Sequence, residues 1–239
     1  MLFPTAFETY RNNEIRVRKW VGYFMSAIHE PNKKVLLDCG CGTGRFALPM
    51  SVFFMRTFGI DKDNAMLDVA RGKDDSIIWI QADVTEIPIK ENSIDVVLAS
   101  MLIEHLDSLD SYLCEAHRLL KENGVFLVRT MLPSDIDNTT WYSFSEKARI
   151  MELNRTYGLE NLLQHFSTYD FILSKEISFF NVIESFSNSN IVDRLSSKSY
   201  EILSHLDETD YNELISRAVL WERKANEEIM SSSLLVFRR

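Results

Sequence analysis

Cysteine and glycine are both scarce in this chain of 239 residues, and long hydrophobic runs are missing. The three cysteines are an odd number, so a disulfide framework is not expected and a reducing, cytoplasmic setting fits best. No uninterrupted apolar run exceeds about four residues, whereas a membrane-spanning helix needs about twenty. The N-terminal stretch up to Trp20 has no apolar core of the kind that signal peptides contain. These absences predict a soluble, globular protein.

Positive charge is also in deficit, because 26 Lys and Arg stand against 35 Asp and Glu, for a formal net charge of −9. Such a balance disfavours binding to phosphate backbones or anionic lipid, so neither nucleic acid nor a membrane is expected as a partner. Hydrophobic residues make up 46% and charged residues 26%, which is ordinary globular usage and excludes disordered and fibrous classes. Without a linker or a repeat, the length favours a single domain over residues 1–239.

Short apolar runs alternate with amphipathic stretches in the first half of the chain. The runs predict strands at 34–39, 53–60, 76–81, 94–100 and 125–130. Helices are predicted from Arg45, over 64–71 with Asp63 as N-cap, and over 109–120 between Asp107 and Gly124. Five strands separated by crossovers predict a mostly parallel sheet with helices on both faces.

The regular alternation of apolar and amphipathic stretches ends after Pro133. A helix is predicted over 159–166, an extended segment over 171–180, and a closing strand over 234–238. Between 188 and 225 the pattern indicates two helices, the second capped near Asp207 or Thr209.

Three of the eight glycines fall within five positions, at Gly40, Gly42 and Gly44. They lie between a predicted strand and a predicted helix, at the edge where parallel sheets bind ligands. Backbone without Cβ atoms lets a bulky cofactor approach closely, although a tight turn alone also uses glycine. Residues 42–47 satisfy the G-x-G-x-x-A pattern of dinucleotide-binding proteins, so a nicotinamide or flavin cofactor stays open at this point.

The segment DCGCGTG, in which the acidic Asp38 precedes G-x-G-x-G, strongly resembles the first motif of class I S-adenosylmethionine-dependent methyltransferases. Residues 33–131 carry the resemblance with its motifs in the family's order, and the most similar subgroup is methyltransferase type 11. The resemblance implies a Rossmann-like α/β fold with a mostly parallel seven-stranded sheet, helices on both faces and an antiparallel last strand. It also implies S-adenosyl-L-methionine as cofactor and a small-molecule acceptor.

The same resemblance assigns parts of the cofactor to residues of this chain. Asp38, Gly40, Cys41, Gly42 and Gly44 would hold the methionine end, Asp61 with the adjacent Lys62 the ribose, Asp83 and Val84 the adenine, Met66 would pack over the adenosine, and Ser100 would line the path to the acceptor. A carboxylate suits the ribose diol because it accepts two strong hydrogen bonds. No catalytic residue is assigned, since methyl transfer needs a general base only when the acceptor atom arrives protonated.

Three segments around the 33–131 core keep alternative interpretations. Residues 1–32 are expected to form a helical lid over the cofactor or to pack as ordinary core. Within 132–239, a helical insertion at about 181–228 separates the last two strands, where the family has a tight hairpin, and would be a substrate cap or a partner interface. Trp141–Phe144 would make the acceptor partly apolar if these aromatic residues cap its pocket.

Other polar residues carry weaker signals. Cys39 and Cys41, with only Cys114 elsewhere, fall short of a zinc ligand set, so no metal is expected. Glu104 and His105 are chain neighbours that would point in different directions on a helix, so they are not assigned as an acid–base pair. Two other functions stay open: a non-catalytic binding or interaction protein of the same fold, and an NAD(P)-dependent oxidoreductase. The acceptor and the oligomeric state do not follow from the sequence.

Overall fold

The computed structural model describes residues 14–178, 191–197, 200–224 and 228–239. Contacts divide the chain into two compact units. The sheet unit comprises residues 12–130, 159–177 and 234–239, and the helical unit is built from residues 131–158 and 178–233. The single domain over 1–239 stays a prediction. Parts of the predicted lid and insertion lie outside the described residues, namely 1–13, 181–190, 198–199 and 225–227.

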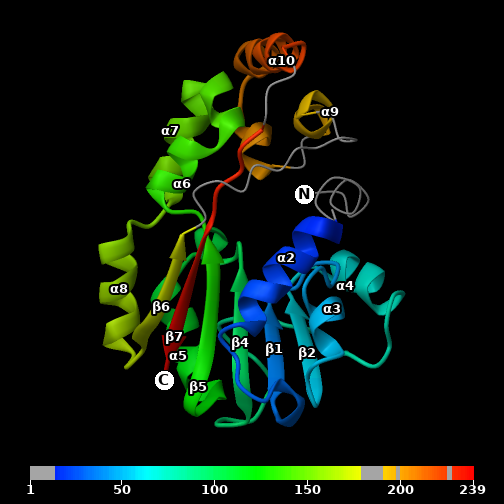
Figure 1. The fold of residues 1–239 in the computed structure, drawn as a ribbon, viewed down its shortest axis with the longest axis vertical. Coiled ribbons are helices and arrows are strands. Elements are labelled where there is room, and N and C mark those ends of the chain that lie inside the picture. Colours follow the sequence, from blue (N-terminus) through cyan, green and yellow to red (C-terminus); the bar gives the residue numbers. More distant parts are fainter. Residues whose placement is uncertain (1–13, 179–190, 198–199, 225–227) are drawn as a thin grey trace. The chain divides into compact units, whose positions relative to one another are not determined.

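Seven strands form one sheet in the order β3-β2-β1-β4-β5-β7-β6 (Figure 1). They are β1 (Val35–Cys39), β2 (Arg56–Asp61), β3 (Ile78–Gln81), β4 (Ile94–Ser100), β5 (Leu120–Thr130), β6 (Ile172–Ser178) and β7 (Ser233–Arg238). The pairs β1–β2, β1–β4, β2–β3 and β4–β5 are all parallel. The end of β7 meets the start of β5, because the N–H of Arg239 donates to the carbonyl of Gly124 (3.1 Å). The last strand is therefore antiparallel, which confirms the predicted fold class.

The direction of each crossover decides which helices cover which face of the sheet. The sheet unit contains the helices α2 (Glu14–Met25), α3 (Ala47–Ser51), α4 (Asn64–Arg71), α5 (Leu109–Leu119) and α8 (Leu159–Thr168), and the short turns η1 (Pro31–Lys33) and η2 (Ile103–His105). The path β1–β2–β3 crosses the sheet in one direction and β4–β5 in the other. Since such crossovers are right-handed, α3 and α4 lie on one face and α5 on the opposite face.

Aromatic side chains join the remaining two helices of the sheet unit to these faces. On α2, Phe24 packs edge-on against Phe46 with the ring centroids 5.2 Å apart, so α2 covers the α3 face (Figure 1). On α8, Phe166 lies 5.5 Å from Phe126 of β5, whose ring also meets Tyr112 of α5 at 5.8 Å. Every residue of β1 is buried, as expected for a strand that is covered on both faces.

Most predicted elements are confirmed, but several of their boundaries are wrong, including those of α5 and of the start of β5. The structure places Ser108 at the N-cap of α5, where its hydroxyl accepts from the N–H of Ser111 (3.1 Å), whereas Asp107 was expected before this helix. Leu120 already belongs to β5 and pairs with Ile94. Gly124 consequently lies within β5 rather than after the helix, beside a register shift between β4 and β5.

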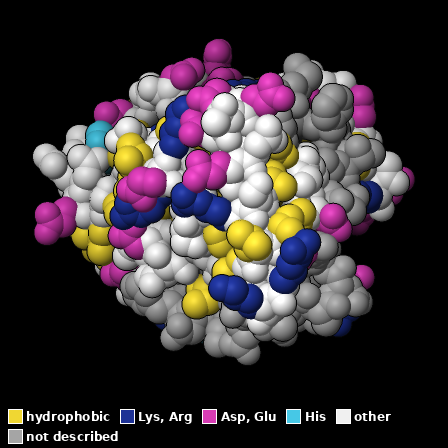
Figure 2. Space-filling view, turned by 90° about the horizontal axis from the view of Figure 1, so that it is seen from above, with side chains coloured by type: hydrophobic (Ala, Val, Ile, Leu, Met, Phe, Trp, Pro, Cys, Tyr) yellow, Lys and Arg dark blue, Asp and Glu magenta, His cyan; other side chains and the backbone are white. Residues whose placement is uncertain are grey.

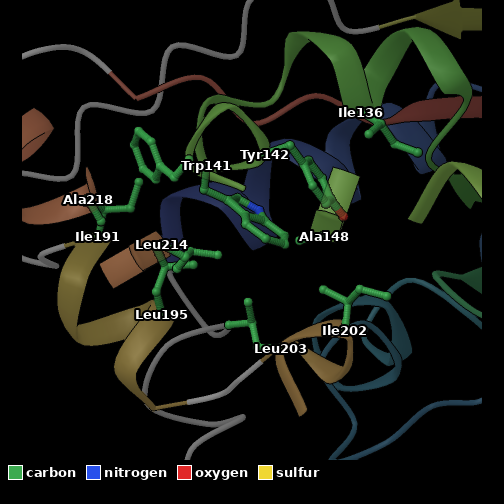
Figure 3. Packing of buried hydrophobic residues seen from close by; sticks show 11 residues of the cluster. Ile136, Trp141, Tyr142, Ala148, Ile191, Leu195, Ile202, Leu203, Leu214 and Ala218 are labelled. Carbon is green, nitrogen blue, oxygen red and sulfur yellow. The ribbon is translucent and has the colours of Figure 1, made fainter. Parts of the chain in front are cut away.

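The helical unit has a core of its own. Its elements are α6 (Pro133–Asn138), η3 (Thr140–Phe144), α7 (Glu146–Arg155), α9 (Ile191–Ser196), η4 (Glu201–His205) and α10 (Glu208–Glu222), the last capped by Asp207 as predicted. Figure 3 shows Trp141 among the side chains of this core. Its ring stacks on Tyr142 with the centroids 3.9 Å apart, and on Tyr200 at 5.0 Å. Trp141 is 1% exposed, so the aromatic segment contributes packing to this unit.

Charges of both signs lie on the surface. In the face seen in Figure 2, Lys and Arg side chains stand next to Asp and Glu, with hydrophobic side chains among them. Among the described helices, none has both the length and the apolar character needed to cross a membrane.

A partly buried ion pair holds the segment after β3 against α5. The carboxylate of Glu115 accepts from the N–H of Ile87 (2.7 Å) and from the guanidinium of Arg118 (2.6 Å). Arg118 in turn donates to the carbonyls of Ile87 (2.9 Å) and Ile89 (3.0 Å). Burial raises the pKa of Glu115, but the hydrogen bonds from Arg118 and Ile87 outweigh it and hold the pKa below its ordinary value.

Replacing Glu115 is therefore predicted to destabilise the fold. Glu115→Ala should lower the free energy of unfolding at pH 7 by about 1.5–3 kcal/mol, the range for hydrogen bonds to a charged group. A carboxyl whose folded-state pKa is depressed stabilises above its unfolded pKa of about 4.3 and loses that contribution as pH falls through the folded value. Urea unfolding should thus show the gap between wild type and variant shrinking below about pH 4. Glu122→Ala, at an exposed position, serves as control and should change little.

Candidate functional site

The glycine loop lies where the strand order reverses. It follows β1, the strand between β2 and β4, and ligands of open α/β sheets bind outside the carboxyl ends of strands at such a point. Gly40, Gly42 and Gly44 have φ values of 65°, 54° and 82°, a region that residues with a Cβ rarely adopt. The three glycines are therefore required by the backbone of the loop itself.

Hydrogen bonds fasten this loop to the end of β2. The N–H of Cys41 donates to the carbonyl of Ile60 (2.9 Å), and the N–H of Gly42 donates to the carboxylate of Asp61 (2.8 Å). The other carboxylate oxygen of Asp61 accepts from the N–H of Asp63 (2.9 Å). A carboxylate oxygen can accept two hydrogen bonds, so Asp61 keeps acceptor capacity for a diol while it holds the loop.

Close packing also explains three glycines. A Cβ on Gly44 would lie 2.8 Å from the ring of Trp79, and a Cβ on Gly59 would lie 2.3 Å from the same ring. On the other side of the loop, a Cβ on Gly40 would meet Leu102 at 2.8 Å. Sequence reasoning missed the contacts of Trp79, which belongs to no motif, although the glycine within the predicted second strand was a signal of close packing.

Asp38 is a buried acid at the centre of the site. It is 2% exposed, and burial raises its pKa to about 8, while the backbone N–H of Ala47 lowers it and the charge of Asp61 raises it. A positive charge beside Asp38 would reverse this effect and favour the carboxylate. The site therefore favours a ligand that brings a cation to β1.

The thiols of Cys39 and Cys41 are poorly reactive. Burial raises the pKa of Cys39 to about 12 and that of Cys41 well above its ordinary value. A thiol needs its thiolate form to act as nucleophile or metal ligand, so neither is suited to that chemistry. Within the described ranges, no group of three or more His, Cys, Asp or Glu could hold a metal ion.

The residues predicted to bind the adenosine part of the cofactor lie at or after the ends of β2 and β3. Asp83 is exposed and accepts from the N–H (2.9 Å) and hydroxyl (2.7 Å) of Thr85, hydrogen bonds that lower its pKa. Val84 and Met66 are buried, at 7% and 8% exposure. Lys62 has an exposed side chain, and its carbonyl accepts from the amide of Gln81 (3.2 Å), which joins the two strand ends.

The segment after β4 completes this edge. Ser100 accepts from the guanidinium of Arg129 on β5 (3.2 Å). Met101 has a φ of 54°, and its N–H donates to the carbonyl of Arg129 (2.7 Å). Glu104 accepts from the hydroxyl of Thr130 (3.3 Å), whereas the side chain of His105 is exposed. Arg129 is a further polar group of this edge that no sequence motif indicated.

The structure thus joins many of the predicted site residues directly. A hydrogen bond links Gly42 to Asp61, the N–H of Cys41 donates to Ile60 beside Asp61, and strand pairing places Asp38 and Ser100 on adjacent strands. Asp83 follows β3, and β2 lies between β3 and the strand β1 that carries the glycine loop. The roles assigned to these residues by resemblance stay predictions.

Comparison with known proteins agrees with this arrangement. Residues 37–128 match the family described as methyltransferase domain. A malonyl-[acyl-carrier protein] O-methyltransferase of Hamiltonella defensa is 28% identical over 170 residues, which are 70% of this chain and 64% of the relative. A probable S-adenosylmethionine-dependent methyltransferase of Mycolicibacterium smegmatis is 33% identical over 95 residues, 40% of this chain and 37% of the relative. The chain thus spans between about two-fifths and two-thirds of these relatives' length.

Solved structures share the fold. A putative methyltransferase from an antibiotic biosynthesis pathway of Anabaena variabilis superposes with a TM-score of 0.77 over 96% of this chain and 98% of its own, at 13% identity. The geranyl diphosphate C-methyltransferase of Streptomyces coelicolor, solved with Mg²⁺, geranyl diphosphate and S-adenosyl-L-homocysteine, gives 0.59 over 93% of this chain and 79% of its own, at 14% identity. At such identities the likeness concerns the fold.

The contact between Trp79 and the glycines predicts a coupled pair of substitutions. Gly59→Ala should lower the free energy of unfolding by about 1–3 kcal/mol or more, because its Cβ would overlap the Trp79 ring. The same change in a Trp79→Leu background should cost clearly less, which chemical denaturation of the four proteins would measure.

Gly72→Ala is the matched control. Its Cβ would make ordinary contacts at 3.6 Å and its φ is −67°, so it should be neutral or stabilise by about 0.4–1 kcal/mol. Equal cost of Gly59→Ala in both backgrounds would show that Trp79 is not what demands the glycine.

Proposed function

We propose that the chain is a class I S-adenosylmethionine-dependent methyltransferase, which transfers the methyl group of S-adenosyl-L-methionine to a small-molecule acceptor. The hydrogen bond between Gly42 and Asp61 carries the proposal, because it holds the carboxylate proposed to bind the ribose next to the loop proposed to bind the methionine end. Asp61 also retains acceptor capacity.

The strand order supports the remaining assignments. Along the carboxyl edge, Asp83 and Val84 follow β3, Asp61 ends β2, and the glycine loop follows β1. Adenine, ribose and methionine succeed one another in the cofactor in the same order. We therefore assign Asp83, Val84 and Met66 to the adenosine, Asp61 and Lys62 to the ribose, and Asp38, Gly40, Cys41, Gly42 and Gly44 to the methionine end.

Bound in this way, the cofactor supplies an activated methyl group, so the protein contributes mainly position and exclusion of water. Aligning two reactants is worth on the order of 7–11 kcal/mol of the barrier. Asp38 and the loop would fix the donor, and Ser100 would border the path to the acceptor. A general base is needed only for an acceptor atom that carries a proton.

The nature of the acceptor and the setting are also proposals. Relatives are named for methylation of malonyl-[acyl-carrier protein] and in ubiquinone biosynthesis, which supports a small or carrier-linked acceptor. Cys39, Cys41 and Cys114 are free thiols, which supports a reducing, cytoplasmic setting. The charge of −9 supports a partner other than nucleic acid.

Ligand titration tests this function. Calorimetry of the purified chain should show binding of S-adenosyl-L-homocysteine and no binding of NADH. Binding of NADH alone would establish the dinucleotide alternative instead. Cofactor binding without methyl transfer to a broad acceptor panel would favour a non-catalytic binding protein.

Asp61 gives the corresponding residue-level prediction. Asp61→Ala should weaken S-adenosyl-L-homocysteine by about 1.5–3 kcal/mol, or roughly 10–150-fold in Kd. The variant should also bind the 2′-deoxy analogue as tightly as the parent ligand, whereas wild type should prefer the parent. Asp68→Ala, an exposed carboxylate paired with Arg71 on α4, should leave Kd unchanged. A wild-type Kd for Asp61→Ala would refute the ribose assignment.

Asp38 predicts a pH dependence of cofactor binding. With a pKa of about 8, its carboxyl is mostly protonated at pH 7, and a cationic ligand favours the carboxylate. Affinity for S-adenosyl-L-methionine should therefore rise from pH 6 to about 8 and then level off, measured against Asp38→Asn to cancel titration of the ligand.

The stability of the protein by itself should change in the opposite sense. Because the folded pKa exceeds the unfolded value of about 3.9, the folded state binds the extra proton, and wild-type stability relative to Asp38→Asn should fall as pH rises from about 4 to 8. If the affinity for S-adenosyl-L-methionine changed with pH in the same way in wild type and in Asp38→Asn, the cation of the ligand would not lie beside Asp38.

A further inference from the structure

The glycine loop is also held from outside the sheet, by the side chain of Lys73. This lysine follows Gly72, the C-cap of α4, and its ammonium group donates to the carbonyl of Thr43 (2.9 Å). Thr43 is fully buried and lies in the loop between Gly42 and Gly44. A charged donor makes a stronger hydrogen bond to a carbonyl than a neutral donor does. Lys73 therefore fixes the orientation of the peptide group between Thr43 and Gly44.

The turn between α4 and β3 is itself fixed, so it can support the loop. The N–H of Lys73 donates to the carbonyl of Ala70 at the end of α4 (3.0 Å). In the next residue, the carboxylate of Asp74 accepts from the N–H of Ser76 (2.8 Å). The carbonyl of Asp74 accepts from the indole N–H of Trp79 on β3 (2.9 Å). These hydrogen bonds tie the turn to α4 on one side and to β3 on the other.

Lys73 and Trp79 reach the same point of the glycine loop from the two sides of this turn. The ring of Trp79 lies 2.8 Å from the position of a Cβ on Gly44, and the carbonyl that Lys73 holds belongs to the residue before that glycine. The N–H of Gly44 donates to the carbonyl of Cys41 (3.0 Å), which closes a tight turn within the loop. The peptide group between residues 43 and 44 is thereby held at its oxygen by Lys73 and at its nitrogen by Cys41.

A loop built on glycines needs such ties from other elements. Glycine has access to more backbone conformations than any other residue, so a loop whose three glycines all have positive φ angles has much conformational freedom to lose. A ligand binds the loop only in its competent conformation, and the apparent affinity falls with the fraction of molecules in that conformation. A lysine that holds the loop peptide raises this fraction without touching the ligand.

We propose that Lys73 is a positioning residue for the cofactor: through the carbonyl of Thr43, it holds the glycine loop in the conformation that binds the methionine end. This inference rests on the proposed function, which assigns that end of the cofactor to the loop. It adds a residue that lies outside the sequence motifs and acts through the loop backbone. An ammonium group at close range would also attract the carboxylate of the cofactor, so the experiment separates the two effects.

Amide hydrogen exchange of the ligand-free protein tests the loop itself. Lys73→Met keeps the aliphatic stem and removes the ammonium group, so the amides of residues 41–45 should exchange roughly three- to tenfold faster than in wild type. Lys73→Arg retains a charged donor and should restore most of the protection. Lys90→Met, the same change at another exposed lysine, should leave it unchanged. Equal exchange of the loop in wild type and Lys73→Met would overturn the proposal, whether or not the chain binds the cofactor.

Calorimetry with three ligands tests the effect on binding. S-adenosyl-L-homocysteine has the whole methionine end, S-adenosyl-3-thiopropylamine lacks its carboxylate, and 5′-methylthioadenosine lacks both the carboxylate and the amino group. Lys73→Met should weaken the first two ligands alike, roughly three- to tenfold in Kd, because both need the competent loop. It should bind 5′-methylthioadenosine as wild type does, and Lys73→Arg should bind all three nearly as tightly as wild type.

The other outcomes of the titration contradict one proposal or the other. Weakening confined to S-adenosyl-L-homocysteine would place Lys73 at the carboxylate of the ligand and overturn its positioning role. Equal weakening of all three ligands would show that Lys73 acts on the adenosine end, and unchanged affinity for all three would show that it does not act on binding, so either result would also overturn the proposal. Failure of wild type to bind any of the three would instead refute the proposed function, and the exchange experiment would still decide whether Lys73 holds the loop.

Discussion

The geometry of the site depends on the hydrogen bond from the N–H of Gly42 to the carboxylate of Asp61. Parallel pairing of β1 with β2 brings both groups to one edge of the sheet, and the bond then fixes a loop with three positive φ angles. Packing secures the same loop from two sides, through Leu102 against Gly40 and Trp79 against Gly44. A loop fixed by the fold has little conformational entropy left to lose when a ligand binds, which favours affinity.

The charges at this edge separate the cofactor alternatives. Asp38 and Asp61 are acids on neighbouring strands, and the charge of Asp61 adds to burial in raising the pKa of Asp38. The pyrophosphate of a dinucleotide would bring further negative charge to these acids, which opposes the ionisation of Asp38. A sulfonium and an ammonium group would instead favour the ionised form of Asp38. The G-x-G-x-x-A pattern at residues 42–47 is thus compatible with either cofactor, whereas Asp38 favours the cationic one.

Much of the fold and the core of the candidate site could be predicted because periodicity and one glycine motif carry that information. The strand at 94–100 and the cap at Asp63 were found as predicted. The N-cap at Ser108 could not be chosen over Asp107, since both residue types cap helices and only the geometry decides. Trp79 and Arg129 were missed because each acts through contacts with residues distant in the chain. The roles of the site residues stay predictions, since the fold places side chains without identifying their ligand.

The aromatic residues at 141–144 were considered as a cap of the acceptor pocket, and their burial argues against this interpretation. Trp141, Tyr142 and Phe144 are each at most 5% exposed, and their rings pack on one another or on Tyr200 and Trp221. Side chains buried in a core offer no apolar surface to a ligand, so they give no support to a partly apolar acceptor. Polar groups stand at the proposed methyl path beside such apolar residues as Leu102, since the hydroxyl of Ser100 accepts from the guanidinium of Arg129. Selection among acceptors at this edge would accordingly act through hydrogen bonds to fixed polar groups, which reject a substrate that leaves such a group unpaired.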